Sequence, residues 1–488
     1  MSFFTDLSHQ YIDGEWRVGR GSWDVIDFNP YNGEKLAAVT AATGVEVDEA
    51  YQAAARAQPG WAAAGPHARR DVLERARSAL VGLREETAEA MIAELGATRA
   101  KAYYEIDLAA EFLRHAAGVA VMPDGELLPA LTPGKENRVY REPAGVVTVI
   151  SPFNYPLLVT LKSVAPALAL GNAVLVKPNQ NTPIVGGGLV ARIFELAGLP
   201  AGVLNVLVTD IAEIGDDLIE HPVPKVISFS GSDRIGRHVA AVAARALKRT
   251  VLQLSGNGAF VALGDLTGAA LDQAVDAAVF SRYVYQGQVC MAANRILVDR
   301  ALEPGFSARF TERVAALRTG DPADPATQLG PVIDSFHAEA LTALVDEALA
   351  EGATPLLHGR TVGNLVEPTI LTGLSPHSPL LRQEIFGPVA LLVPFDGDEE
   401  GLRLTNDTPY GLSSAVHTGD AERGVAFARR VEAGMIHVNG TTMEDDPMAA
   451  FGGVKRSGIG RLNGAASVDA FTTQRWISVQ HGPATYEL

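Results

Sequence analysis

The chain has 488 residues, which is enough for two or three domains with separate buried cores. Its 57 Asp and Glu residues outnumber its 40 Lys and Arg residues, giving a formal net charge of -17. Such a surface repels phosphate backbones and anionic lipids, so we expect neither nucleic acid nor a membrane as a partner. The single cysteine excludes an intrachain disulfide and a multi-cysteine metal site, and we expect no bound metal.

No segment has the pattern of a targeting or membrane-spanning sequence. The first ten residues lack a basic segment followed by an apolar core, which is the pattern of an export signal. The most apolar helical stretch, residues 157–170, contains Lys162 and Pro166 and is shorter than the roughly 20 residues that span a bilayer. We therefore expect a cytoplasmic protein.

The first half of the chain predicts an α/β domain. Residues 1–120 mix strand and helix patterns, and a Pro/Gly cluster at 122–134 indicates that the chain leaves this region. From Ala144, apolar β-branched runs alternate with helical patterns, which predicts a parallel sheet covered on both faces. The expected strands are 146–150, 173–176, 203–207, 225–229 and 251–254, and the expected helices are 156–170, 183–197, 211–220 and 233–247.

A second alternating series follows Cys290 and predicts a second α/β domain. Its expected strands are 295–298, 389–394, 412–417 and 435–439, and its expected helices are 306–317, 338–349 and 422–431. Ligands of parallel sheets bind at the carboxyl ends of the strands, so we expect the binding and catalytic groups in the turns that follow these strands.

Three such turns carry candidate groups. Residues 225–236 predict a strand, a Gly-Ser turn and a helix start, where Ser232 and backbone N–H groups could hold a pyrophosphate; a plain βα turn is equally compatible. Asn154 ends the first strand and could donate to a developing oxyanion or cap the next helix. Lys177 ends the second strand, where it could equally be a solvated charge.

Cys290 lies at the junction of the two series, in the segment Tyr285–Asn294, between a helix and a strand. A lone cysteine is more often a small buried apolar residue than a nucleophile. Glycine and polar residues just before it indicate exposed backbone rather than core, and a thiolate attacks carbonyl carbon readily once its pKa is lowered.

Seven ordered motifs together resemble the aldehyde dehydrogenase superfamily over essentially the whole chain. They are Ser151–Pro156, Gly171–Pro178, Phe229–Ser232, Gly287–Cys290, Gln383–Val389, Asn406–Leu412 and Phe451–Arg461. The run Thr441–Pro447 is most similar to the benzaldehyde/vanillin dehydrogenase branch.

The resemblance implies a Rossmann-like cofactor-binding domain, a second α/β catalytic domain and a small β arm for oligomerisation. It places NAD(P) binding in residues 1–121 and 142–252, catalysis in 253–440, and a homodimer or homotetramer arm in 122–141 and 465–488. It also implies NAD or NADP as the cofactor and an aldehyde as the small-molecule substrate.

Site residues follow from the same resemblance. Cys290 is the implied nucleophile, Asn154 helps to bind the oxyanion, and Gln253 stands where the family has its general base. The implied cofactor-binding residues are Ser151, Pro152, Phe153, Lys177, Gln180, Gly231, Ser232, Gly236, Leu254, Glu384 and Phe386. The implied substrate-pocket residues are Tyr155, Lys162, Val289 and Met291.

Two departures from the family pattern bear on turnover. Relatives have Glu-Leu-Gly-Gly where this chain has Gln253-Leu-Ser-Gly256, and that Glu opens the thioester in them. After Arg461, where many relatives carry a proton-relaying Glu, this chain has Leu462–Ala466. A third difference, neutral Gln180 at a position where NAD-preferring relatives carry Glu, favours acceptance of both NAD and NADP.

These features leave three functions open. The leading hypothesis is a hydrolytic aldehyde dehydrogenase for apolar, aromatic aldehydes. The second is an acyl-transferring enzyme whose thioester is opened by a thiol such as coenzyme A, and the third is a cofactor-binding protein without turnover. For Lys162 we weigh attraction of a carboxylate or phenolate on the substrate against an ordinary solvated lysine.

Overall fold

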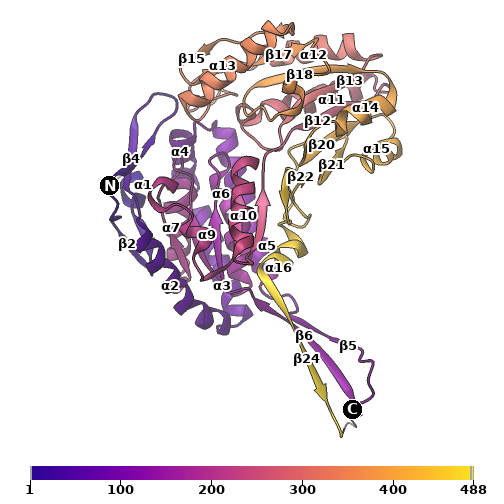
Figure 1. Ribbon diagram of the computed structural model, residues 1–488. Helices are drawn as coiled ribbons and strands as arrows, with labels where there is room; N and C mark the ends of the chain where they lie inside the picture. The colour runs from indigo at the N-terminus through magenta and orange to yellow at the C-terminus, as the bar shows by residue number, and fades with distance from the viewer. Residues whose placement is uncertain (1–2, 484–485, 487–488) are drawn as a thin grey trace.

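The computed structural model describes residues 3–483 and 486, which form two α/β lobes and a projecting β arm (Figure 1). The N-terminal lobe contains an eight-stranded sheet in the order β2-β1-β9-β8-β7-β10-β11-β23. Its five central strands run parallel, and antiparallel strands close both edges. The strands are β1 Gln10–Ile12, β2 Glu15–Arg17, β7 Val146–Ile150, β8 Ala173–Lys177, β9 Leu204–Val206, β10 Pro224–Ser230, β11 Arg249–Gln253 and β23 Gly458–Ile459.

Helices cover both faces of this sheet, so successive residues of one strand enter different cores. In β8, Val174 and Val176 pack with helices α5 (Arg99–Val119) and α6 (Pro156–Ala169). The intervening Ala173 and Leu175 pack with α2 (Gly44–Ala63) on the opposite face. This two-residue period explains why these strands are continuous apolar runs in the sequence. The other helices of the lobe are α1 Phe3–Leu7, α3 Pro66–Gly82, α4 Arg84–Leu95, α7 Leu189–Leu196, α8 Ile211–Ile214, α9 Asp217–Glu220 and α10 Asp233–Arg245.

The second lobe contains a seven-stranded sheet in the order β14-β17-β18-β13-β12-β20-β21, parallel except at β14. Its strands are β12 Gly258–Ala262, β13 Ala293–Asp299, β14 Thr354–Leu357, β17 Thr369–Thr372, β18 Val389–Phe395, β20 Ser413–His417 and β21 Met435–Val438. Its helices are α11 Gly268–Tyr283, α12 Glu303–Ala315, α13 Ser335–Ala350, α14 Gly397–Asn406 and α15 Ala421–Ala428. The chain returns to the first lobe at β23, and the short helix α16, Gly464–Phe471, then packs against α6.

The arm is a three-stranded antiparallel sheet that extends away from both lobes (Figure 1). It consists of β5 Gly125–Leu128, β6 Lys135–Pro143 and β24 Thr472–Gln480. Strand β24 pairs with β6 along its whole length, from Thr472 opposite Pro143 to Gln480 opposite Lys135. The two segments expected to form the arm therefore meet in one sheet, although they are far apart in the sequence.

The α/β fold class is confirmed, with local differences from the sequence-based elements. The helix expected at 183–197 begins with a π-helical turn, Ile184–Gly188, which contains three consecutive glycines, before α7. The helix expected at 211–220 is interrupted at Gly215, whose φ of +53° is outside the helical region. The central strand β12 was not predicted. Among the described residues, no helix is long and apolar enough to cross a membrane.

Candidate active site

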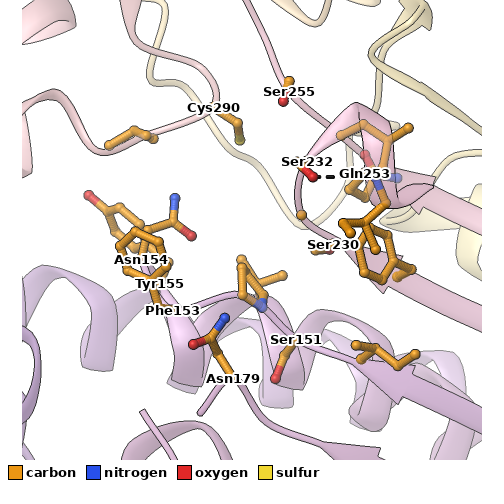
Figure 2. A pocket seen from close by; sticks show the side chains of 18 of the residues that line it. Ser151, Phe153, Asn154, Tyr155, Asn179, Ser230, Ser232, Gln253, Ser255 and Cys290 are labelled. Atoms are coloured by element: carbon orange, nitrogen blue, oxygen red, sulfur yellow. Dashed lines mark hydrogen bonds between the residues drawn. The ribbon is translucent and has the colours of Figure 1, made fainter. Parts of the chain in front are cut away.

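A cavity of about 630 Å³ lies at the carboxyl ends of the parallel strands in the first lobe and reaches the Cys290 loop of the second. Figure 2 shows Cys290 and Asn154 on one side, Gln253 and Ser232 across from them, and Ser255 between. Every residue that the sequence predicts for the site lines this cavity except Gly236. Gly236 instead packs under Leu254, and a Cβ there would collide with the Leu254 methyl groups.

The loop that carries Cys290 has an unusual backbone. It follows α11, and Tyr285, Gln286 and Gly287 adopt positive φ values of 49°, 53° and 70°. A Cβ at Gly287 would lie 2.5 Å from the carbonyl oxygen of Gly387, so this position requires glycine for space as well as conformation. Strained backbone of this kind persists only where the surrounding structure holds it in place.

Arg282 provides much of that support. Its guanidinium is fully buried and donates to the carbonyl oxygens of Gly287 (2.9 Å), Ile385 (3.1 Å) and Gly387 (2.5 Å). One cation thereby holds the loop of Cys290 and the loop of Glu384 together. Charged hydrogen bonds to buried carbonyls are the stronger kind, so we infer that the relative position of these loops is well fixed.

The surroundings of the Cys290 thiol oppose its ionisation. Burial is the main cause that raises its pKa to about 12, and the negative charges of Glu384 and Asp445 add to the effect. The ammonium of Lys162 acts in the opposite direction. At neutral pH the resting thiol is therefore protonated, and it needs a proton acceptor or a favourable charge to become a nucleophile.

Asn154 is placed beside the cysteine loop. It is buried just before α6, and its Nδ2 donates to the carbonyl oxygen of Gln288 at 3.0 Å. The side-chain amide does not cap α6, because the residue before that helix is Tyr155 and no side-chain cap bond is present there. A carboxamide has two N–H donors, so one remains for a developing oxyanion.

Gln253 ends β11 and is buried, and neither of its amide atoms has a partner among the described residues. Its Oε1 lies toward Gly452, where an added Cβ would be 3.2 Å away. An unpaired buried amide is costly, and it has free capacity to hold a water molecule. It has no basic lone pair with which to accept a proton from that water at neutral pH.

One end of the cavity fits a dinucleotide. Among the described residues, Lys177 has a single hydrogen bond, from Nζ to the Pro178 carbonyl at 3.2 Å, and burial lowers its pKa to about 8. The buried hydroxyl of Ser151 has no partner among the described residues, and Ser232 caps the N-terminus of α10 through its Oγ. Unused donors beside a helix N-terminus suit ribose hydroxyls and a pyrophosphate. Gln180 is exposed at the same end.

Glu384 lies between this end and the cysteine. Its Oε1 accepts a hydrogen bond from the Gly256 N–H at 2.9 Å, and burial raises its pKa to about 7. A Cβ on Gly256 would collide with the carbonyl oxygen of Cys290, so the backbones of these two residues are in contact. Only the backbone of Gly256 therefore lies between the Glu384 carboxylate and Cys290. The ring of Phe386 contacts Phe153 edge-on, with centroids 5.7 Å apart.

The opposite end of the cavity is lined mainly by apolar and aromatic side chains. Tyr155, Lys162, Val289 and Met291 all lie here. The charge state of the surroundings of Lys162 differs from both alternatives that the sequence left open. Lys162 is neither a solvated lysine nor a free cation, because its buried Nζ is 2.7 Å from Asp445 Oδ2. Six further residues line this end and were not predicted from the sequence. They are Tyr104, Leu108, Met443, Asp445, Phe451 and Leu462. Only Asp445 had a signal in the sequence, the acidic run at 444–446.

Comparison with known proteins identifies the family. The pattern described as the aldehyde dehydrogenase family matches residues 16–477. The chain belongs to the aldehyde dehydrogenase family. It is 48% identical over 482 residues to benzaldehyde dehydrogenase YfmT of Bacillus subtilis, covering 98% of both chains. It is 41% identical over 477 residues to a vanillin dehydrogenase of Corynebacterium glutamicum, covering 97% of this chain and 98% of that one.

A solved structure of another aldehyde dehydrogenase supports the same placement. The NAD-dependent benzaldehyde dehydrogenase from Corynebacterium glutamicum superimposes with a TM-score of 0.90 at 39% identity. The match covers 98% of this chain and 97% of that one. The two-lobed architecture with its arm is therefore the aldehyde dehydrogenase fold, and the resemblance to the benzaldehyde/vanillin branch is confirmed.

Proposed function

We propose that this chain oxidises aromatic aldehydes to carboxylic acids with NAD or NADP, through a covalent intermediate on Cys290. The observation that carries the proposal is the single cavity, which brings the only thiol of the chain, the Asn154 amide and a dinucleotide-compatible groove together. The names of the relatives, benzaldehyde and vanillin dehydrogenases, support the aromatic substrate class.

The proposed chemistry begins with the thiol. Cys290 gives its proton to water, which carries it to the solvent, and its sulfur attacks the aldehyde carbon, which converts the carbonyl oxygen to an oxyanion. The free N–H of Asn154 and the backbone N–H of Cys290 donate to that oxygen. When the carbonyl re-forms, the carbon releases a hydride and a thioester to Cys290 remains. Attack by water then breaks the carbon–sulfur bond and returns the acid and the thiol.

The dinucleotide, when bound, supplies the acceptor for the hydride. Lys177 and Glu384 are the groups we assign to its riboses, and Gly231 and Ser232 border the pyrophosphate. Gln180 carries no charge to repel a 2′-phosphate, so we expect a preference for NAD over NADP below about a thousandfold, or roughly 4 kcal/mol. In this proposal residues 1–121 and 142–252 bind the cofactor, 253–440 form the catalytic domain, and 122–141 with 465–488 form the oligomerisation arm. Within the last range, residues up to Phe471 belong to helix α16 on the first lobe, so the strand of the arm begins at Thr472. Residues 484–485 and 487–488 of this range lie outside the described residues.

A second candidate follows from Gln253. The Gln253 amide cannot accept a proton from water, so hydrolysis of the thioester lacks a general base. An acyl acceptor that is itself a good nucleophile would not need this base. A thiol such as coenzyme A attacks the thioester as a thiolate and needs no water-activating carboxylate. This acyl-transferring function shares the first half-reaction and differs only in the group that releases the acyl product.

A kinetic experiment separates these functions. The enzyme is mixed with NAD and benzaldehyde, with and without coenzyme A, and NADH is followed from the first milliseconds. The hydrolytic function predicts steady turnover without coenzyme A, whereas the acyl-transferring function predicts turnover only with it. Cys290→Ala must abolish NADH formation in both cases. A native enzyme that binds NAD but forms no NADH with any aromatic aldehyde would refute both and leave the non-catalytic function.

A further inference from the structure

The aldehyde end of the cavity contains a buried ion pair that the proposed chemistry does not use. Lys162 on α6 and Asp445 on the loop after β21 are 2.7 Å apart, with side chains only 3% and 5% exposed. Both residues line the same cavity as Cys290. A buried pair of this kind gives little net stability compared with apolar residues, so its presence in a substrate cavity suggests another role.

Both partners are held from several sides. The second carboxylate oxygen of Asp445 accepts a hydrogen bond from Asn463 Nδ2 at 3.0 Å, and the same amide donates to the Asp446 carbonyl. The Lys162 ammonium lies 3.4 Å from the centroid of the Phe451 ring and 5.2 Å from that of Phe112. Neither charge is therefore free to turn toward a ligand without leaving its partners.

The pair lies within electrostatic reach of the reacting sulfur. The charge of Lys162 lowers the pKa of Cys290 and the charge of Asp445 raises it, so the two act in opposite directions on the thiol. The neighbouring walls are Tyr104, Met443 and Phe451. An aromatic ring bound through its aldehyde carbon to Cys290 would extend toward an apolar and aromatic wall. The net charge of this wall is zero, because the charges of Lys162 and Asp445 cancel.

We propose that the Lys162–Asp445 pair determines substrate specificity, because Asp445 cancels the only cation in this part of the cavity among the described residues. The site then accepts uncharged aromatic aldehydes and discriminates against aldehydes that carry a carboxylate. This inference rests on the proposed function and goes beyond it by naming the charge class of the substrate and the residue that selects it.

The test compares two substrates of nearly equal shape, para-formylbenzoate and para-formylbenzamide. Asp445→Asn leaves the Lys162 cation uncompensated, so the ratio of kcat/KM for the anion to that for the amide should rise by about ten- to a hundredfold. Lys162→Met leaves the Asp445 anion uncompensated, so the same ratio should fall. In the double variant the site is neutral again and the ratio should return close to that of the unaltered enzyme.

Glu444→Gln is the matched control. It removes one negative charge from the adjacent, exposed position of the same loop and should leave the ratio unchanged. If a single variant does not fold, judged by circular dichroism and NAD binding, the other single variant still decides the question through the sign of its shift. Equal losses for both substrates would show a purely structural pair and overturn the proposal. Failure of the unaltered enzyme to oxidise even the amide would instead refute the proposed function.

Discussion

Cys290, the nucleophile that we propose, rests as the protonated thiol at neutral pH. Since burial and the nearby carboxylates raise its pKa to about 12, the thiolate fraction of the free enzyme should keep rising with pH well beyond the ordinary thiol range. We therefore expect the rate of alkylation by iodoacetamide to increase through about pH 10 without a plateau near 8.5. Intact-mass measurement gives the rate directly, because Cys290 is the only thiol and Cys290→Ala should take no label. A plateau below about pH 9 would contradict the raised thiol pKa.

The presence of Gln253 leads to a separate prediction for the hydrolysis of the thioester. A positioned general base contributes about 10²- to 10⁴-fold, so its absence should leave thioester opening slow. We expect a burst of NADH close to one equivalent per site, followed by slow turnover. Gln253→Glu should accelerate the slow phase and leave the burst amplitude unchanged, as followed by stopped-flow absorbance.

The appropriate control is Gln253→Leu, which keeps the volume but removes the hydrogen bonds to water. It should slow the steady phase further while the burst survives. Fast turnover without a burst in the unaltered enzyme, and without added thiol, would show that another group activates water. Glu384 would then be the first residue to test, because its raised pKa of about 7 suits a general base.

Helix α6, which follows Asn154, is fixed at its N-terminus by a buried ion pair. Glu105 Oε1 accepts the backbone N–H groups of Leu157 and Leu158 at 3.0 and 3.1 Å, and its carboxylate also binds the Lys101 ammonium. Removing one partner of a buried pair costs about 3–5 kcal/mol, because an unpaired charge remains. We expect Glu105→Gln to lower the free energy of unfolding of the first lobe by that amount, measured by urea denaturation.

A surface pair that involves α5, the helix that carries Glu105, provides the comparison. Asp107 binds Arg84 with its side chain 62% exposed, and exposed pairs contribute about 0–1 kcal/mol. Asp107→Asn should therefore change stability little. An equal loss in both variants would mean that the Glu105 contacts do not support α6 in the way the structure indicates.

The strands and helices that carry the site were largely predictable, and the reasons are physical. Apolar β-branched runs such as Val146–Ile150 keep their pattern because both faces of the sheet are covered. Strand β12, Gly258–Ala262, escaped prediction although turn residues flank it, because a short continuous apolar run has no period that separates a buried strand from a buried helix segment. Motif resemblance located Cys290, Asn154 and Glu384. It could not give Asp445, whose importance depends on a partner 283 residues away.

At the scale of the whole molecule, the arm exposes apolar side chains that a lone chain would leave in water. Leu127 and Trp476 are 71% and 69% exposed on β5 and β24. The register places them on opposite faces of the arm sheet, with Leu127 in line with Arg138 and Trp476 in line with Val139. Large exposed apolar residues on a projecting arm indicate an interface, and we expect the arm to join copies of this chain into a homodimer or homotetramer. The double variant Leu127→Asp, Trp476→Glu should reduce the molar mass measured by light scattering. Leu247→Glu, at an exposed position outside the arm, should not.

The position of Cys290 and Glu384 in one cavity has a consequence for cofactor binding. Thiol ionisation and dinucleotide binding in one cavity are linked equilibria, so each must shift the other by the same factor. If a bound dinucleotide lowers the thiol pKa by one unit, the thiolate form must bind that dinucleotide about tenfold more tightly than the thiol form. The pH dependence of the dissociation constant and the dinucleotide dependence of alkylation should therefore yield one coupling constant. The enzyme would then generate its nucleophile mainly when the hydride acceptor is in place, and an unliganded chain would be protected from stray electrophiles.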